Sequence, residues 1–338
     1  MTISYQAAVL HAPGQKLAIE TVKVVQMKPA DVLVRIKAAG LCHTDLEVID
    51  GSLRTPMPIL LGREAAGIVE QTGPEACGVE VGDHVVLSWN PHCGDCFYCG
   101  RDLPILCEDY PAGSQKALHF DRDGRARLAD GRTLHQLMYL GTFSEYAVVS
   151  NQEAVAVPAA IRFEQACLLG CGIMTGAGAA LNVRYGDAVM VIGCGAVGLA
   201  AVQGARLEGA GTIIAVDLDD GKLSLARRDG AAQCVNARQD DAVAAAHAAT
   251  GGRGVDAVFE AAGSQAAFGM SIEAVRPGGE VIWLGKIDVA HSVSLRWRAL
   301  MQEKRLRWVT THPSCCLTIG GMDVRLDRAR VGLVHHLP

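Results

Sequence analysis

Four cysteines lie close together in the segment CGDCFYCGRDLPILC, as Cys93, Cys96, Cys99 and Cys107. Thiolates at this spacing can surround a tetrahedral Zn²⁺ ion as a closed structural site. Two disulfides, cysteines that are merely buried, and an iron–sulfur cluster are alternatives, since their spacings overlap. The chain holds twelve cysteines, and in a reducing compartment such close spacing favours metal over disulfides.

Three glycines in VIGCGAVG, namely Gly193, Gly195 and Gly198, have the spacing of a dinucleotide-binding turn. They follow a continuous apolar strand (188–193) and open an alanine-rich helix (196–210), which is the context this pattern requires. The first glycine permits the tight turn, the second allows the backbone to approach a pyrophosphate, and the third allows close helix packing. A glycine-rich turn in some other βαβ protein is the alternative.

Asp217 ends the next predicted strand, 19 residues after Gly198. A carboxylate at this place accepts hydrogen bonds from the adenosine ribose and repels a 2′-phosphate. The sequence therefore predicts NAD rather than NADP as the cofactor.

The elements that must position these residues differ between the two parts of the chain. The first 150 residues contain short strands (31–40, 67–73 and 82–89) bounded by glycine or proline, which indicates a barrel-like β unit. From residue 188, strands alternate with helices, and such an order predicts a parallel sheet covered on both faces. The further strands expected are 212–217, 255–263 and 278–285, and the further helices are 220–231, 240–250 and 264–275.

Bulk composition excludes several classes of protein. The chain has 338 residues, enough for two domains, and its net charge of −5 argues against a general nucleic-acid binder. No apolar run is long enough to cross a bilayer, and no signal peptide is recognisable at the start. We therefore expect a cytoplasmic protein without membrane or nucleic-acid partners.

Three stretches together resemble the zinc-containing medium-chain alcohol dehydrogenases: GLCHTD (40–45), the four-cysteine segment, and LLGCGIMTGAGAALN (168–182). The resemblance is closest to the alcohol and thiol-linked formaldehyde dehydrogenases that carry a structural zinc. It implies an α/β protein with a GroES-like β-barrel catalytic domain (1–152) and a Rossmann NAD-binding domain (153–290). It also implies zinc and NAD as cofactors, a small alcohol or aldehyde as substrate, and a homodimer or homotetramer.

The same resemblance implies roles for individual residues. Cys42 and Cys171 match ligands of a catalytic zinc, and the four clustered cysteines match the structural ligands. Thr44 matches the hydroxyl that takes the alcohol proton. The cofactor would be contacted by His43 at the pyrophosphate, Thr175 at the nicotinamide and Lys222 at the ribose. Each residue also has an ordinary interpretation: Cys42 and Cys171 as small buried side chains, Thr44 as a helix cap, and His43 as a solvated loop residue.

The sequence departs from the family at the stretch LLGREAAG (60–67). Arg63 stands where the family has a zinc-ligating histidine, and a guanidinium offers no lone pair to a metal. Our prediction is that Glu64 becomes the third ligand and that Arg63 neutralises the added negative charge. The competing outcome is an empty site, because a cation beside Zn²⁺ repels it. Glu47 replaces a basic or histidine residue of the proton relay, and it too could accept a proton.

The end of the chain (291–338) is expected to hold the end of the Rossmann domain and a tail that is atypical for the family. After residue 307 the sequence WVTTHPSCCLTIGG shows no amphipathic helix, and Cys315 and Cys316 have no partner motif. A shifted reading frame or a truncation would explain it, and reduced stability is expected. The sequence thus predicts a zinc-dependent enzyme that moves a hydride between a primary alcohol, or a thiohemiacetal, and NAD. The alternatives are an impaired NAD-binding relative that keeps only the structural zinc and, less well supported, a zinc-free quinone reductase.

Overall fold

The computed structural model describes residues 3–109, 125–287, 291–295, 297 and 301–309. The described residues form two compact units, which we call unit 1 (through Cys171) and unit 2 (from Gly172). The predicted features of the tail after residue 309, including Cys315 and Cys316, lie outside the described residues.

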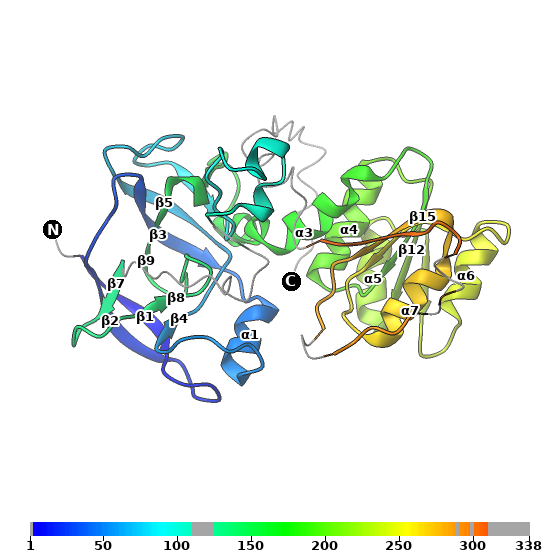
Figure 1. Ribbon diagram of the computed structural model, residues 1–338, viewed down its shortest axis with the longest axis horizontal. Coiled ribbons are helices and arrows are strands. Elements are labelled where there is room, and N and C mark those ends of the chain that lie inside the picture. The colour runs from blue at the N-terminus through cyan, green and yellow to red at the C-terminus, as the bar shows by residue number, and fades with distance from the viewer. Residues whose placement is uncertain (1–2, 110–124, 288–290, 296, 298–300, 310–338) are drawn as a thin grey trace. The chain divides into compact units, whose positions relative to one another are not determined.

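Unit 1 is built from short strands in two sheets, as the sequence predicts (Figure 1). One sheet has the strand order β7-β2-β1-β4-β8 and the other the order β10-β6-β5-β3-β9. The strands are β1 (Ser4–Leu10), β2 (Ala18–Val24), β3 (Asp31–Ala39), β4 (Ile59–Leu60), β5 (Ala65–Thr72), β6 (His84–Leu87), β7 (Ala126–Leu128), β8 (His135–Gln136), β9 (Tyr146–Ser150) and β10 (Ala154–Ala156).

The second sheet of unit 1 supports the candidate centre. β3 pairs with β5 and β9, and its buried Val32 and Val34 pack in one cluster with Val85 and Leu87 of β6. Cys42 and Cys171 belong to the same cluster, so the sheet core continues directly into the sulfur atoms. The remaining elements of unit 1 are helical: α1 (His43–Asp50), η1 (Cys99–Arg101), η2 (Pro104–Leu106), η3 (Asn151–Glu153), α2 (Phe163–Ala166) and η4 (Cys167–Gly170).

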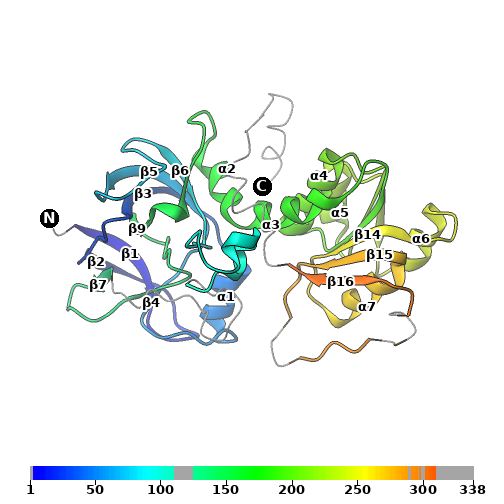
Figure 2. The same ribbon diagram turned by 45° about the horizontal axis from the view of Figure 1, so that its top comes forward.

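Unit 2 is a six-stranded parallel sheet in the order β13-β12-β11-β14-β15-β16. Figure 2 shows β14, β15 and β16 side by side. Its strands are β11 (Ala188–Ile192), β12 (Thr212–Asp217), β13 (Gln233–Asn236), β14 (Val255–Glu260), β15 (Val275–Trp283) and β16 (Arg305–Trp308). Its helices are α3 (Gly172–Ala179), η5 (Ala180–Asn182), α4 (Ala196–Leu207), α5 (Asp220–Asp229), α6 (Ala242–Ala249) and α7 (Gln265–Ala274).

Alternate residues of each central strand pack on opposite faces of this sheet. Val189 and Val191 of β11 join the core beneath α4 and α5, whereas Met190 and Ile192 join the core beneath α6 and α7. Burial on both faces explains why the strand sequence is apolar throughout. The predicted α/β class and helix-covered parallel sheet are confirmed.

Two features of the fold were not part of the sequence-based outline. The edge strands β13 and β16 were not expected, since each is only four residues long. The segment 153–171 packs with unit 1, where β10 pairs with β6. The outline's limits for the domains, at 152 and 290, stay a prediction.

Candidate catalytic centre and cofactor site

The four clustered cysteines converge in unit 1. Their sulfur atoms all lie within 4.8 Å of one another. Three of the separations are 3.5 Å for Cys93–Cys107, 3.9 Å for Cys93–Cys99 and 4.0 Å for Cys96–Cys107. These are too long for disulfides, and four thiolates around tetrahedral zinc stand about 3.8 Å apart. The cluster therefore fits a zinc ion.

The segment that carries this cluster, residues 93–107, which we call the four-cysteine lobe, has little regular structure of its own. It contains the two short turns η1 and η2 and no strand. Backbone amides donate to the sulfurs: Cys93 N to Cys107 Sγ and Cys96 N to Cys93 Sγ, both at 3.3 Å. Few apolar side chains of the lobe are buried. The sulfur cluster is therefore the main element that can hold the lobe together.

Cys42 and Cys171 lie 129 residues apart in the chain, and their sulfurs are 3.9 Å apart. We call these two residues the sulfur pair. Cys42 precedes α1, and Cys171 follows η4. Gly170 makes the approach of Cys171 possible, because a Cβ there would overlap the carbonyl oxygen of Leu87 in β6. The separation again suits two thiolates of one tetrahedral zinc.

Asp45 joins α1 to the turn that contains Arg63. Its carboxylate accepts from the amides of Cys42 (2.9 Å) and Gly62 (2.8 Å). Gly62 has a φ of +94°, and a Cβ there would overlap Thr142, so only glycine fits this turn. Burial raises the pKa of Asp45 to about 6. The sequence alone did not single out Asp45, since its role depends on a partner 17 residues away.

Arg63 is buried beside the sulfur pair, with only 8% of its surface exposed. Its Nη1 donates to Oγ1 of Thr44 at 3.1 Å, and its guanidinium lies over the ring of Trp89 at 4.4 Å. Its Nε has no hydrogen-bond acceptor within the part of the chain that the structure describes. Trp89 could not be singled out from the sequence, in which it only ends an apolar strand.

Glu64 is also buried, but its carboxylate is not grouped with both sulfurs. Among the described residues, no set of three ligand atoms within 4.8 Å of one another contains the sulfur pair. The carboxylate lies against Gly40, where a Cβ would overlap it. The sulfur pair therefore fits zinc, while the third ligand does not fit as placed, because Arg63 cannot ligate and the carboxylate of Glu64 does not lie within 4.8 Å of both sulfurs. Glu64 as a ligand stays a prediction.

Charges at this centre act on one another. The hydrogen bond between Cys171 and Cys42, together with the charge of Arg63, lowers the pKa of Cys42 to about 4 against the effect of burial. The same hydrogen bond and burial raise the pKa of Cys171. Burial acts to lower the pKa of Arg63, but the facing sulfurs and Glu64 raise it overall. The two thiols are therefore unequal, since the pKa of Cys42 is lowered and that of Cys171 is raised.

The predicted strand–turn–helix arrangement around the three glycines is present in unit 2, between β11 and α4. Gly193 has a φ of +90° and packs on Ala262, and a Cβ on Gly198 would overlap the carbonyl oxygen of Gly193. A Cβ on Gly195 would meet nothing within 4 Å. The turn is thus closely packed at its first and third glycines and open at its second, which suits an approaching pyrophosphate.

Asp217 is fixed at the carboxyl end of β12, beside this turn. Its Oδ2 accepts from Cys194 N at 2.7 Å, and its Oδ1 accepts from Leu218 N (2.7 Å) and Asp219 N (3.0 Å). A carboxylate has about four acceptor positions, so one remains for a ribose hydroxyl. Cys194 N therefore orients the side chain that the sequence assigns to the ribose.

Glu260 holds together two loops at the same edge of the sheet, and the sequence did not single it out. Its Oε1 accepts from the amides of Ala262 and Gly263, both at 2.8 Å. Its main-chain oxygen accepts from Leu284 and Gly285, at the end of β15. The loop that it holds packs against Gly193 of the glycine turn. Burial raises the pKa of Glu260 to about 6, although the amide donors oppose this shift.

This raised pKa predicts a pH dependence of stability. Because the folded chain binds the proton of Glu260 more tightly than the unfolded chain, the contribution to stability is complete below about pH 4.5 and is lost as the pH rises through about 6. We expect the unfolding free energy of the wild type, relative to Glu260→Gln, to fall by about 2 kcal/mol between about pH 4 and pH 7. Denaturant titrations of both proteins across this range measure it, and parallel pH profiles would contradict it.

The remaining predicted residues are placed as follows. In α1, His43 is exposed and Glu47 is half-buried, while Thr44 is buried. In unit 2, Thr175 is buried within α3, and Lys222 is exposed in the first turn of α5. The roles of His43, Glu47, Thr175 and Lys222 stay predictions.

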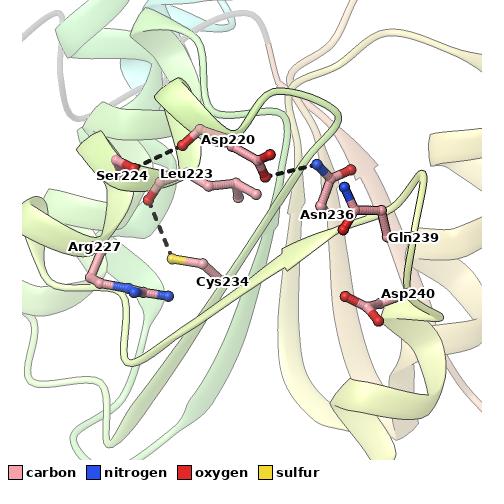
Figure 3. A pocket seen from close by; sticks show the side chains of 8 residues that line it. All are labelled: Asp220, Leu223, Ser224, Arg227, Cys234, Asn236, Gln239 and Asp240. Atoms are coloured by element: carbon pink, nitrogen blue, oxygen red, sulfur yellow. Dashed lines mark hydrogen bonds between the residues drawn. The ribbon is translucent and has the colours of Figure 1, made fainter.

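A polar cavity of about 300 Å³ lies on the flank of unit 2, between α5 and β13 (Figure 3). Asn236 there donates to Asp220 at 2.8 Å, and Cys234 donates to the carbonyl of Leu223. The cavity is lined by Asp220, Leu223, Ser224, Arg227, Cys234, Asn236, Gln239 and Asp240. None of these belongs to the predicted site.

Across the described ranges, no helix is both long and apolar enough to traverse a bilayer.

Comparisons with known proteins agree with this geometry. A family model described as the alcohol dehydrogenase GroES-like domain matches residues 28–159, and one described as zinc-binding dehydrogenase matches residues 196–312. An S-(hydroxymethyl)glutathione dehydrogenase of Saccharomyces cerevisiae is 36% identical over 300 residues, which is 86% of this chain and 78% of the yeast protein. A protein of the same name from Escherichia coli is 36% identical over 298 residues, covering 86% of this chain and 80% of its own length.

Solved structures with the same fold include two bacterial enzymes. An alcohol dehydrogenase zinc-binding domain protein from Burkholderia ambifaria has a TM-score of 0.91 and 35% identity, covering 98% of this chain and 91% of that one. Benzyl alcohol dehydrogenase from Acinetobacter calcoaceticus has a TM-score of 0.87 and 30% identity, with the same coverage of both chains.

Proposed function

Because the chain belongs to the zinc-containing medium-chain alcohol dehydrogenase family and is a zinc-dependent, NAD-linked oxidoreductase of alcohols and aldehydes, we propose that its reaction centre is the sulfur pair with Thr44 and Arg63. The observation that carries this proposal is the 3.9 Å approach of Cys42 to Cys171 beside the buried hydroxyl of Thr44. Zinc held by the four-cysteine lobe would be structural, since four thiolates leave no position for substrate.

NAD, when bound, accepts a hydride from the carbon that carries the alcohol, and the protein supplies position and electrostatics. The cofactor is assigned to unit 2, with its pyrophosphate at the turn that contains Gly193, Gly195 and Gly198 and its ribose at Asp217. Three backbone amides hold the carboxylate of Asp217 in place. Because this carboxylate repels a 2′-phosphate, it favours NAD over NADP.

Thr44 is assigned the transfer of the hydroxyl proton. Its Oγ1 accepts from Arg63 at 3.1 Å, and its hydroxyl also forms a hydrogen bond that acts on Cys42. Placed between a cation and a sulfur, this hydroxyl is oriented by both neighbours and lies in the buried part of the centre. General acid–base groups at such positions contribute at least about 10²-fold to rate.

Thr44→Val removes this hydroxyl while keeping the shape of the side chain. We expect kcat for alcohol-dependent NADH formation to fall about 10²-fold, with the Kd for NAD unchanged because the glycine turn and Asp217, which are assigned to NAD, lie in unit 2 and the change leaves His43 in place. Thr44→Ser is the matched control and should keep most of the activity. A Thr44→Val protein as active as the wild type would remove Thr44 from the mechanism.

The substrate is proposed to be a small primary alcohol or a thiohemiacetal. The support is the pair of curated relatives, whose names specify S-(hydroxymethyl)glutathione, and the structural relative that is named for benzyl alcohol. Absorbance of NADH with ethanol, benzyl alcohol and the formaldehyde–glutathione adduct tests the proposed function. If NAD binds and no alcohol gives NADH, the catalytically impaired alternative is correct. The cytoplasmic location and the homodimer or homotetramer stay proposals. Sedimentation of the purified protein tests the number of subunits.

A further inference from the structure

Arg63 stands at the chain position where the family has a zinc-ligating histidine, and its charge acts on both sulfurs of the pair. It is held there from two sides, by Thr44 Oγ1 and by the ring face of Trp89. Only 8% of the surface of Arg63 is exposed, so its guanidinium cannot turn into solvent without breaking both contacts. Guanidinium stays protonated, so it offers neither a lone pair nor a neutral form to a metal.

The chemistry of the side chains disfavours a metal at this place. Zinc needs a third protein ligand besides the two thiolates, and the guanidinium of Arg63 cannot supply one. The carboxylates of Glu64 and Asp45 act on the charge of Arg63, but among the described residues no carboxylate or imidazole is grouped with both sulfurs. Without a metal, the same guanidinium lies beside two sulfur acceptors. The geometry therefore favours a single cation at this centre, and the guanidinium of Arg63 already supplies it.

Arg63 also has an unused donor. Its Nε is buried and lacks an acceptor within the described part of the chain. A buried donor without an acceptor is costly and marks a place where a ligand oxygen is expected. The oxygen of an aldehyde, which gains negative charge as hydride reaches its carbon, is an acceptor that such a donor stabilises.

We propose that Arg63, rather than a second zinc ion, is the resident cation of the sulfur-pair centre and that it polarises the carbonyl oxygen of the aldehyde. The proposal rests on the proposed function for its substrate. In the reduction direction, the C–H bond of NADH breaks with its electron pair and a new C–H bond forms at the carbonyl carbon. The oxygen takes its proton from Thr44, which recovers one from solvent, and the products are the alcohol and NAD⁺. Zinc dependence then comes from the four-cysteine lobe alone.

Zinc content tests the first half of this proposal without any assay of turnover. Elemental analysis and native mass spectrometry of the wild type should give one zinc per chain. Arg63→His supplies the missing imidazole and should raise the content to two, and Cys171→Ser added to Arg63→His should return it to one. Two zinc ions in the wild type would overturn the proposal, and loss of one of them in Glu64→Gln would assign the third ligand to Glu64. The zinc content of the wild type tests the proposal by itself, so the test stays decisive even if a variant fails to fold.

Kinetics test the second half. Arg63→Met removes the charge and supplies no imidazole. We expect zinc content to stay at one, the Kd for NADH to stay constant, and kcat/KM for aldehyde reduction to fall at least about 10²-fold. Unchanged kcat/KM in Arg63→Met would overturn the polarising role. Failure of the proposed function is distinguishable, because it would appear as no NAD-linked turnover in the wild type, whatever its zinc content.

Discussion

Replacement of Cys107 by serine is expected to remove one zinc ion per chain and to unfold the four-cysteine lobe. Cys107 is fully buried, and it contacts both Cys93 and Cys96 through sulfur. Zinc bound by thiolates contributes about 10–16 kcal/mol of apparent binding free energy in small zinc domains at neutral pH. Since the lobe has no strand and few buried apolar side chains, that binding is its main source of stability.

Hydrogen exchange locates this effect. The amides of Gly100, Leu103 and Leu106 donate within the lobe and should lose protection in Cys107→Ser. Amides of β3 and β5, which pair in the sheet of unit 1, should keep theirs. Cys77→Ser is the control, because Cys77 is an exposed cysteine outside the cluster. Unchanged zinc content, or protection that survives its loss, would show that the lobe does not depend on the metal.

Gly198→Ala is expected to impair both the stability of unit 2 and its binding of NAD. The added Cβ would overlap the carbonyl oxygen of Gly193, a backbone atom that cannot turn aside. Either α4 or the turn must move, at a cost of about 3 kcal/mol. If the displaced turn no longer fits the pyrophosphate, the Kd for NAD rises by more than about 10²-fold.

Two other glycines separate packing from binding. A Cβ on Gly195 meets nothing within 4 Å, so Gly195→Ala should melt like the wild type and yet bind NAD poorly, since its methyl group enters the space assigned to pyrophosphate. Gly269 lies within α7 and is similarly unobstructed, and Gly269→Ala should leave binding unchanged. Thermal melts and NAD titrations of the three variants measure both quantities. Normal NAD binding by Gly195→Ala would show that the pyrophosphate does not bind at this turn.

Much of the molecule was predictable because the relevant information is local. The alternation of charged and apolar residues in 31–40 predicts β3 (Figure 1). The apolar run at 188–193 predicts β11. The spacing of the four cysteines predicts their cluster, since a chain that turns around one ion must place its ligands a few residues apart. The three glycines are likewise interpretable, because the turn and the helix start that require them lie within six residues of one another.

The tertiary structure decided how distant side chains meet. The sequence by itself determined that Arg63 cannot be a metal ligand, because that follows from the chemistry of guanidinium. Only the fold placed Arg63 between Thr44 and Trp89 and directed Glu64 toward Gly40. Only the fold brought Cys42 to Cys171 across 129 residues, and set Glu260 to hold two loops. The physical reason is that periodicity and spacing act within a few residues, whereas the direction of a buried side chain depends on segments that pack from elsewhere in the chain.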